Sequence, residues 1–466
     1  MPGTPDVGRS KGFPNVRFDL SPEIGNRNRS DALTNNDQDL GQPDRQNRAD
    51  RGNLTRRSFV SGSLAAIATT TVALHRSGAA ASASRVISDV EHIKLHGDPN
   101  TYCGHPRQCG LYNFGRGEIV VMHNHAPSLY QVRRDIQHDF AGYHSRAVVL
   151  LQRSTDGGRT WPGENDIEVW NEAAPQEQRE KFLLSALTSP RESVDLSRPE
   201  SMILFPRTFL GPNRYGAPQM VAFALRSADK GKTWERTPTL VLPPPGCHSA
   251  APDNTPIVRM PDGTWLFPNR VYGGKVGVSL YASTDNGLSW QFRTHVCEPA
   301  GYPALLLLKS GRLQCYNYPL GMSYSDDGGK TWSQRKVIVP PDPSPWAASD
   351  PVYHEELAHR SPAPILLRDG RILILFARRL SPRMGIGGII SEDGGATWSP
   401  DFILRDDADP SNTSMVRSQR HDYSDIGYPL MTELEDGRIF TAYYFLKKDG
   451  NGFGGSRFIA GSFFRI

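Results

Sequence analysis

The chain has 466 residues, enough for one large domain or two of ordinary size. Its 53 Lys and Arg residues exceed its 49 Asp and Glu residues by four, and three of those four excess charges lie in residues 1–84. The nearly neutral remainder argues against nucleic-acid binding, and no run of eighteen apolar residues exists that would predict a conventional membrane-spanning helix.

The first part of the chain has the composition of a leader. Residues 1–53 are rich in Asn, Asp, Arg, Gly and Pro, which predicts disorder or a translation start placed too early. Residues 54–84 contain the Arg56-Arg57 pair, then a moderately apolar run, then Ala81-Ser82-Ala83. This order resembles a twin-arginine export signal. It predicts cleavage near residue 84, a mature chain that begins at about Arg85, and a periplasmic or secreted location.

The cysteines fit an exported protein only loosely. There are five, so at least one thiol is free or is bonded to another chain. Cys103 and Cys109 are close enough in sequence to pair. Cys247-His248 could bind zinc, but no second ligand pair has finger-like spacing. We therefore expect buried, unreactive cysteines.

The strongest pattern in the remainder is an octapeptide, S-x-D-x-G-x-[ST]-W, which uses five of the eight tryptophans. Its residues predict a structural turn, because the Asp can accept backbone N–H bonds and the Gly can adopt a positive φ. The Trp can pack across the base of the hairpin. The copies are 154–161, 227–234, 283–290, 325–332 and 391–398.

A second repeat precedes most copies of the octapeptide. It consists of an apolar strand, a turn with Gly, and another apolar strand, which is a hairpin pattern. Each unit then continues with a third strand, the octapeptide and a fourth strand, so it predicts a four-stranded antiparallel blade. Examples of the second repeat are 255–270, 302–318, 361–379 and 428–445.

The octapeptide is the Asp box, and the chain resembles the sialidase-like β-propeller superfamily over residues 85–466. We expect an all-β propeller of six blades, the sixth spanning about 426–466 without a box. A strand at 86–95 would close the ring. The long interval after the first box leaves seven blades as an alternative, although 163–198 resembles a polar insertion. No helical periodicity separates the strands, which excludes a doubly wound α/β fold.

Blade topology places candidate functional residues at one end of the ring, where each innermost strand begins and each second strand finishes. The positions that converge there are rich in Arg, His and Tyr. Guanidinium groups bind carboxylates in a bidentate manner, so we expect them to hold an acidic sugar such as a sialate or uronate. The candidate substrate-binding residues are Arg270, Arg360, Arg378, Asn254, His125 and Arg214.

The same end carries candidates for proton transfer and nucleophilic attack. Histidine has a pKa near neutrality, and its position on two adjoining strands suits acid–base chemistry. The candidate catalytic residues are His123, His144, Tyr428 and Tyr215. The sequence HEELAH at 354–359 has its histidines five apart rather than the four of a zinc helix, so we expect no metal and no cofactor.

The resemblance implies specific roles for two of these residues. Sialidases bind the substrate carboxylate with three arginines and use a Tyr nucleophile assisted by a Glu, with an Asp as acid/base. Tyr428 in DIGYP matches the nucleophile position, and Arg270 matches one of the arginines. The family's first arginine lies in an Arg-Ile-Pro motif that is absent here, and the Glu position is occupied by 253–255, Asp-Asn-Thr.

Other propellers of the superfamily act on uronate-containing glycans with His, Tyr and Arg at the mouth, and the spacing of His123 and His144 resembles that group. The leading hypothesis is therefore an exported, monomeric enzyme that cleaves a glycosidic bond in an acidic glycan, by hydrolysis or elimination, with His and Tyr as acid and base. The alternatives are an exo-α-sialidase with Tyr428 as nucleophile, a glycan-binding propeller without catalysis, and a scaffold for protein partners.

Overall fold

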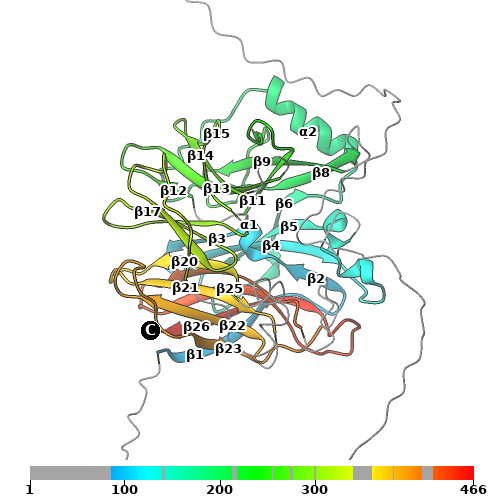
Figure 1. The fold of residues 1–466 in the computed structure, drawn as a ribbon. Helices are drawn as coiled ribbons and strands as arrows, with labels where there is room; N and C mark the ends of the chain where they lie inside the picture. Colours follow the sequence, from blue (N-terminus) through cyan, green and yellow to red (C-terminus); the bar gives the residue numbers. More distant parts are fainter. Residues whose placement is uncertain are drawn as a thin grey trace, which may run out of the picture.

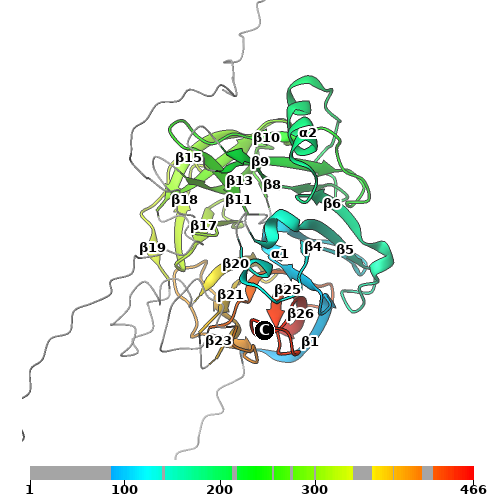
Figure 2. The ribbon, with the colours of Figure 1, turned by 90° about the vertical axis from the view of Figure 1, so that its right-hand side faces the viewer.

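The computed structural model describes residues 86–138, 142–212, 218–253, 257–272, 277–298, 301–338, 359–380, 383–411 and 423–466. These residues form six antiparallel sheets that are arranged as the blades of a six-bladed β-propeller (Figures 1 and 2). The sequence-based prediction of the fold and of six blades is confirmed. The described residues contain no helix that is long and apolar enough to cross a membrane.

In blades one to three the innermost strand is broken into two short strands, both of which pair with the second strand. Blade one contains β2 (Thr101–Gly104), β3 (Gly110–Gly115), β4 (Glu118–Pro127), β5 (Val148–Ser154) and β6 (Ile167–Asn171). Blade two contains β7 (Met202–Leu204), β8 (Arg207–Pro212), β9 (Pro218–Ser227) and β10 (Thr239–Val241). Blade three contains β11 (Ser249–Pro252), β12 (Val258–Arg259), β13 (Trp265–Tyr272), β14 (Gly277–Ser283) and β15 (Gln291–Cys297).

The remaining blades have a single innermost strand each. Blade four contains β16 (Ala304–Leu307), β17 (Leu313–Asn317), β18 (Gly321–Ser325) and β19 (Lys336–Val337). Blade five contains β20 (Arg360–Leu366), β21 (Ile372–Arg378), β22 (Gly385–Ser391) and β23 (Phe402–Arg405). Blade six contains β24 (Gly427–Glu433), β25 (Ile439–Leu446), β26 (Arg457–Arg465) and, from the other end of the described chain, β1 (Ser88–His96).

The pairing of β1 with β26 closes the ring, as the sequence predicted. The two strands run antiparallel from Ser88 opposite Arg465 to His96 opposite Ile459. They lie side by side in blue and red at the lower edge of Figure 1. Closure covers the edge of β26 with β1, so blade six does not expose an unpaired strand edge on which other chains could aggregate.

Short helical segments interrupt the blades. The four-residue α1 (Pro106–Cys109) lies between β2 and β3 and occupies the middle of the molecule in Figure 2. Three 3₁₀ turns are η1 (Arg133–Asp135), η2 (Tyr143–Arg146) and η3 (Gly163–Asn165), and the longest helix is α2 (Gln176–Thr188).

Helix α2 and β6 lie within 163–198, where a polar insertion was predicted, so that prediction was incomplete. Part of the segment is the outer strand of blade one, which also accounts for the long interval that suggested a seventh blade. The helix escaped prediction because it buries only Arg179 and Leu183 and therefore has no apolar periodicity.

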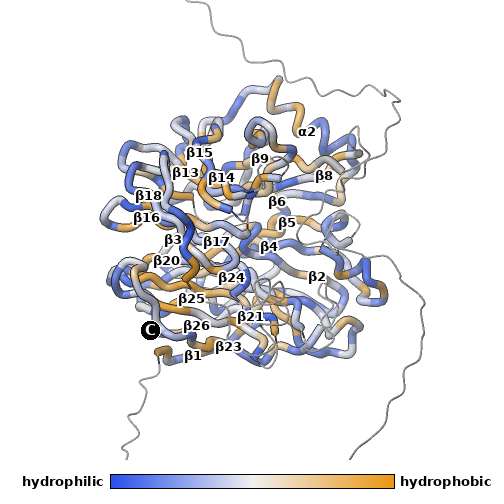
Figure 3. Tube along the Cα trace, in the orientation of Figure 1, coloured by the Kyte–Doolittle hydropathy of each residue, from blue (hydrophilic) through white to orange (hydrophobic). Residues whose placement is uncertain are grey.

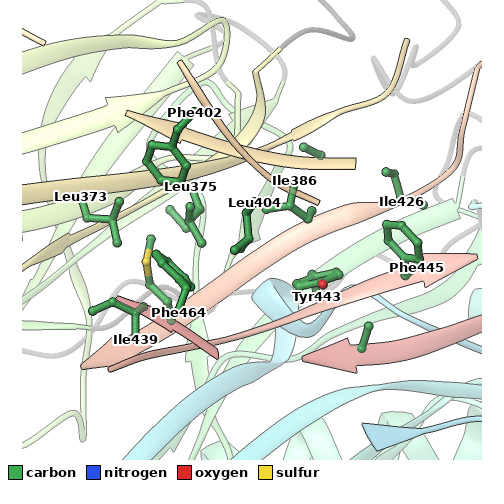
Figure 4. Packing of buried hydrophobic residues seen from close by; sticks show 14 of the residues in the cluster. Leu373, Leu375, Ile386, Phe402, Leu404, Ile426, Ile439, Tyr443, Phe445 and Phe464 are labelled. Carbon is green, nitrogen blue, oxygen red and sulfur yellow. The ribbon is translucent and has the colours of Figure 1, made fainter. Parts of the chain in front are cut away.

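The core lies between neighbouring blades rather than inside one of them. Strands such as β21, with the sequence ILILFAR, read as continuous apolar runs because a neighbouring blade covers each face. Figure 3 shows apolar segments along these strands and hydrophilic segments in the connecting loops. Figure 4 shows the largest such interface, between blades five and six. Its labelled residues are Leu373, Leu375, Ile386, Phe402, Leu404, Ile426, Ile439, Tyr443, Phe445 and Phe464.

Each Asp box connects the third and fourth strands of its blade and forms the predicted turn. In the first copy, Oδ1 of Asp156 accepts the backbone N–H of Thr160 at 2.9 Å, and Oδ2 accepts the Thr160 hydroxyl at 2.6 Å. Gly158 adopts φ 89°, which favours glycine. The Trp161 ring stacks on Phe440 of blade six at 5.8 Å between centroids. The tryptophan therefore fastens its turn to the neighbouring blade.

We predict that Asp156→Ala lowers the free energy of unfolding by about 1 kcal/mol at pH 7. Burial alone would raise the pKa of Asp156, but hydrogen bonds from Thr160, Ser154 and the backbone dominate and lower it to about 2. A depressed carboxyl pKa stabilises the fold above its unfolded value and loses that effect as pH falls toward 2. Urea unfolding at several pH values checks this, with the surface substitution Asp406→Ala as a control that should change little.

The five cysteines are free thiols. Cys103 and Cys109, which are close enough in sequence to pair, do not do so: Cys103 lies in β2 and Cys109 in the following helix α1, and both are buried as expected. Cys315 is buried as well, while Cys247 and Cys297 are half-buried. Burial raises the pKa of Cys103 to about 12, which keeps the thiol protonated at neutral pH.

Candidate active site

The innermost strands begin, or are split in two, at points that lie around the axis of the ring. Arg107 of α1 shows this directly, because its side chain is fully buried and reaches blades four and five. Its Nη2 donates to the carbonyl oxygens of Tyr302 at 2.5 Å and Pro303 at 3.0 Å, and its Nη1 donates to that of Pro362. One guanidinium therefore joins three blades at the centre of the propeller.

Five side chains from five blades form what we call the arginine–tyrosine cluster: Arg107, Arg270, Tyr302, Arg360 and Tyr428. The hydroxyl of Tyr302 accepts hydrogen bonds from Arg360 Nη2 at 2.7 Å and from the Tyr428 hydroxyl at 2.6 Å. The guanidinium groups of Arg270 and Arg360 lie 4.7 and 5.0 Å from the centre of the Tyr302 ring. The structure thus brings together the predicted residues Arg270, Arg360 and Tyr428.

Sequence reasoning missed Arg107, the first arginine of the cluster. The family's first arginine lies in an Arg-Ile-Pro motif, whereas Arg107 is followed by Gln108 and Cys109. A usable signal existed, because Arg107 precedes a strand–Gly-Arg-Gly–strand unit as Arg360 and Tyr428 precede theirs. Burial lowers the pKa of Arg107 to about 10, and the opposing charge of Asp253 limits the shift, so the side chain is charged at neutral pH.

The backbone around the cluster holds conformations that cost energy. Tyr302, Ser361 and Tyr428 have φ values of 39°, 55° and 55°, and His105 has 57°. Left-handed residues other than glycine cost of order 1 kcal/mol each and concentrate at functional sites. Their presence at the starts of several innermost strands supports a function at this end of the axis.

A second network adjoins the cluster and centres on Asp425, which is 3% exposed. Its Oδ1 accepts the Tyr444 hydroxyl at 2.5 Å, and its Oδ2 lies 3.1 Å from His138 Nε2 and 3.5 Å from Arg457 Nε. Burial alone would raise the pKa of Asp425, but His138, Arg457 and Arg379 hold it well below its usual range. Asp425 is therefore a permanent buried anion.

His105 is a further residue that sequence reasoning missed. Its ring lies edge-on to Tyr428, with 4.5 Å between ring centroids, and the hydroxyl of Tyr143 bonds to its Nδ1. Burial lowers the pKa of His105 well below 6.5, and the nearby His138 and His144 lower it further. A neutral imidazole therefore packs against the predicted nucleophile. His144, a predicted catalytic residue, stacks on His105 with 5.9 Å between ring centroids and is half-buried.

His123 and His125 lie elsewhere. Both are on the face of β4 that meets β1, because alternate residues of a strand point to the same side. His123 bonds to Asn124 O at 3.0 Å and Gln152 Oε1 at 3.2 Å, and its ring lies 5.1 Å from that of His96. Burial, and then the neighbouring His96, lower the pKa of His123 to about 3. These described partners include no residue of the arginine–tyrosine cluster, so the hydrogen bonds do not bring His123 together with Tyr428.

Arg378, a predicted substrate-binding residue, lies at the surface, and its neighbour Arg379 is the buried one. Arg378 forms an ion pair with Asp401 and is 30% exposed, whereas Arg379 is 1% exposed and donates to Tyr423 at 2.8 Å and Tyr444 at 2.7 Å. Neighbouring residues at a strand end point to opposite sides, and only Arg379 points inward. Asn254, Arg214 and Tyr215 lie outside the described residues.

An open depression lies between blades one and two and reaches Pro252 of blade three. Gln108 and Pro252 line it, and these residues directly neighbour Arg107 and Asp253 in the chain. His144, Trp170 and Arg207 also line it. Polar, aromatic and basic groups are the types that bind sugars.

Comparison with known proteins places the fold. The family model of the BNR repeat-like domain matches residues 197–441, slightly more than half of the chain. A search of curated protein sequences found no significant match. A solved structure of a protein of unknown function from Dyadobacter fermentans DSM 18053 has TM-score 0.57 and 18% identity, and the match covers 82% of this chain and 99% of that one.

Trypanosoma rangeli sialidase also has a similar fold. Its structures with sialic acid and as the covalent intermediate with 2,3-difluorosialic acid each have TM-score 0.51 and 14% identity. The matches cover 81% and 82% of this chain but only 59% of the sialidase, so this chain spans about three fifths of that protein's length. At such identities the likeness shows the fold alone.

Proposed function

Because this chain belongs to the BNR repeat-like domain family and folds as a sialidase-like propeller, we propose that it is an exported enzyme that hydrolyses a glycosidic bond of a carboxylated sugar. One observation carries the proposal: guanidinium groups from blades one, three and five converge on Tyr302, whose phenol accepts a hydrogen bond from Tyr428. Such convergent guanidinium groups suit a carboxylate, which they bind in a bidentate manner.

Arg107, Arg270 and Arg360 would hold the sugar carboxylate. The described partners of Arg107 are backbone carbonyl oxygens rather than a carboxylate, so its charge has no ion-pair partner among the described residues. A carboxylated ligand at the axis would supply one. With the carboxylate fixed, the anomeric carbon would lie near the phenol of Tyr428, and this positioning is itself a large part of catalysis.

Tyr428 would act as the nucleophile. Its hydroxyl donates to Tyr302, so Tyr302 in its phenolate form, stabilised by Arg360 and Arg270, would take that proton and become neutral as the Tyr428 oxygen attacks. The Tyr428 oxygen bonds to the anomeric carbon, the glycosidic bond breaks, and the leaving oxygen takes a proton. His144 lines the open depression and is the candidate donor. Water then attacks the anomeric carbon and gives one proton to His144, while Tyr428 leaves and takes its proton back from Tyr302.

Hydrolysis fits this geometry better than elimination does. The sequence left hydrolysis and elimination open, with His123 and His144 as candidate acid and base, and His123 lies between blades one and six instead. A tyrosine nucleophile requires no second carboxylate, unlike most glycoside hydrolysis. The similar fold of Trypanosoma rangeli sialidase makes sialosides the first substrates to test, with uronides second.

The test is incubation with fluorogenic sialosides and uronides and with uronate polysaccharides, followed by mass analysis. Hydrolysis adds one water to the products, whereas elimination adds none and creates an unsaturated sugar that absorbs in the ultraviolet. A water-added acidic sugar is the expected result. Unsaturated products would overturn the hydrolytic proposal, and binding without turnover across the panel would instead support the non-catalytic glycan-binding propeller.

On whichever substrate is turned over, Arg360→Lys should lower kcat/KM by about 10²-fold, since lysine cannot form the bidentate pair. The matched control is Arg378→Lys, because Arg378 pairs with Asp401 at the surface and should change kcat/KM by less than about twofold. Equal effects of the two substitutions would contradict the assignment of Arg360 to the carboxylate.

A further inference from the structure

Three ligating side chains meet where the ring closes, and none of them belongs to the arginine–tyrosine cluster. His96 ends β1, the closing strand of blade six, while Cys103 and His125 lie on β2 and β4 of blade one. One ligand atom of each lies within 4.8 Å of the others. They form the one group of this kind among the residues that the structure describes, and we call it the closure triad.

The spacing of the closure triad matches a tetrahedral metal site. His96 Nε2 lies 3.1 Å from His125 Nδ1, and Cys103 Sγ lies 3.6 Å from the same atom. With Zn–N of about 2.05 Å and Zn–S of about 2.3 Å, tetrahedral angles require N···N of about 3.3 Å and N···S of about 3.6 Å. The two ligand-to-ligand distances that involve His125 Nδ1 are therefore close to those of a tetrahedral zinc site.

The surroundings provide the outer support that metal-bound histidines have. Nδ1 of His96 lies 2.8 Å from Gln152 Nε2 and 3.9 Å from Asp166 Oδ2, and Gln152 also bonds to Asp166. When Nε2 of His96 binds a metal, its Nδ1 carries the proton, and a carboxylate or a rotated amide can accept it. The His96 side chain is 21% exposed, so an ion can enter from solvent and water can fill the fourth position.

We propose that His96, Cys103 and His125 bind one zinc ion that fastens the closing strand to blade one. The Cys103 thiol releases its proton to solvent as the sulfur–metal bond forms, and the two imidazoles bind as neutral groups. The ion links β1, which otherwise pairs with β26, to two strands of the next blade. Its role is to stabilise closure of the ring, and it is independent of the proposed hydrolysis.

Cobalt(II) serves as the probe, because its thiolate complexes absorb visibly while zinc is silent. Titration of the metal-free full chain should show one tetrahedral Co²⁺ per chain with a thiolate charge-transfer band, displaced by Zn²⁺. Zinc should raise the Tm by several degrees. Cys103→Ser should abolish the band and the shift, and His125→Gln should weaken binding by at least about tenfold.

The matched control is Cys247→Ser, which removes a half-buried thiol that adjoins a histidine in sequence but lies outside the triad. Its titration should equal that of the unmodified chain. The proposal is overturned if the unmodified chain shows no thiolate band, if the band persists in Cys103→Ser, or if it disappears in Cys247→Ser. The thiolate band of the unmodified chain is measured without any variant, so the proposal can be tested even if a substituted chain fails to fold.

Discussion

Replacing Tyr428 by phenylalanine should lower kcat by at least about 10³-fold while leaving the fold intact. The substitution removes only the hydroxyl, which donates to Tyr302 and is the proposed nucleophile. The remaining ring keeps its edge contacts with His105 and Tyr302. Because the arginines that would hold the carboxylate are unchanged, KM should change little.

Steady-state kinetics on the best substrate of the panel, with the Tm of each variant, measure this effect. The control is Tyr324→Phe, since Tyr324 lies on β18, is 38% exposed and stacks with Arg312 far from the axis. That variant should retain full activity. Turnover that survives in Tyr428→Phe at the unmodified rate would exclude Tyr428 as the nucleophile and shift attention to the neutral His105 beside it.

The second large effect concerns stability. Asp425→Asn should lower the free energy of unfolding at pH 7 by about 3–5 kcal/mol, the usual consequence of removing one partner from a buried ion pair. The substitution keeps the shape of the side chain but leaves the guanidinium groups of Arg379 and Arg457, which are 1% and 0% exposed, without their carboxylate. Tyr444 and His138 also lose their acceptor.

The pH dependence of this effect has a definite sign. The pKa of Asp425 is held well below its usual range in the folded protein, so its stabilisation is fully present above about pH 4. It is lost as the pH falls further, because protonation of the unfolded chain is then favoured. The difference in unfolding free energy between the unmodified chain and Asp425→Asn should therefore shrink below about pH 4.

Urea unfolding between neutral and acidic pH checks both statements. Asp401→Asn is the matched control, because Asp401 pairs with Arg378 at the surface and is 28% exposed. We expect it to lower the unfolding free energy by less than about 1 kcal/mol. If Asp425→Asn were as stable as the unmodified chain at pH 7, the stability of the buried network would not depend on the charge of the Asp425 carboxylate.

The fold was predictable from the sequence because its signals are local. The Asp box specifies its own turn through hydrogen bonds within eight residues, as between Asp156 and Thr160. Apolar strands separated by Gly turns specify hairpins. Helix α2 was not predicted, because a helix that buries only two residues has almost no apolar periodicity.

The candidate site was predictable only where topology places a residue at the beginning of an innermost strand or at the end of a second strand. Arg270, Arg360 and Tyr428 follow this rule, and they meet around Tyr302. His105 and Arg107 belong to the short helix that breaks the innermost strand of blade one, so the rule did not reach them. His123 and Arg378 followed the rule but point to the other side of their strands.

The amino-acid sequence by itself thus predicted the blades and the ring closure, because turns and hairpins are formed by residues close together in the chain, whereas the structure decided between six and seven blades. Only the tertiary structure decided which side chains share a site. His96, Cys103 and His125 meet because the first described strand closes the last blade beside blade one. Such contacts depend on the side that each strand residue faces once blades pack, and a single local pattern does not contain that information.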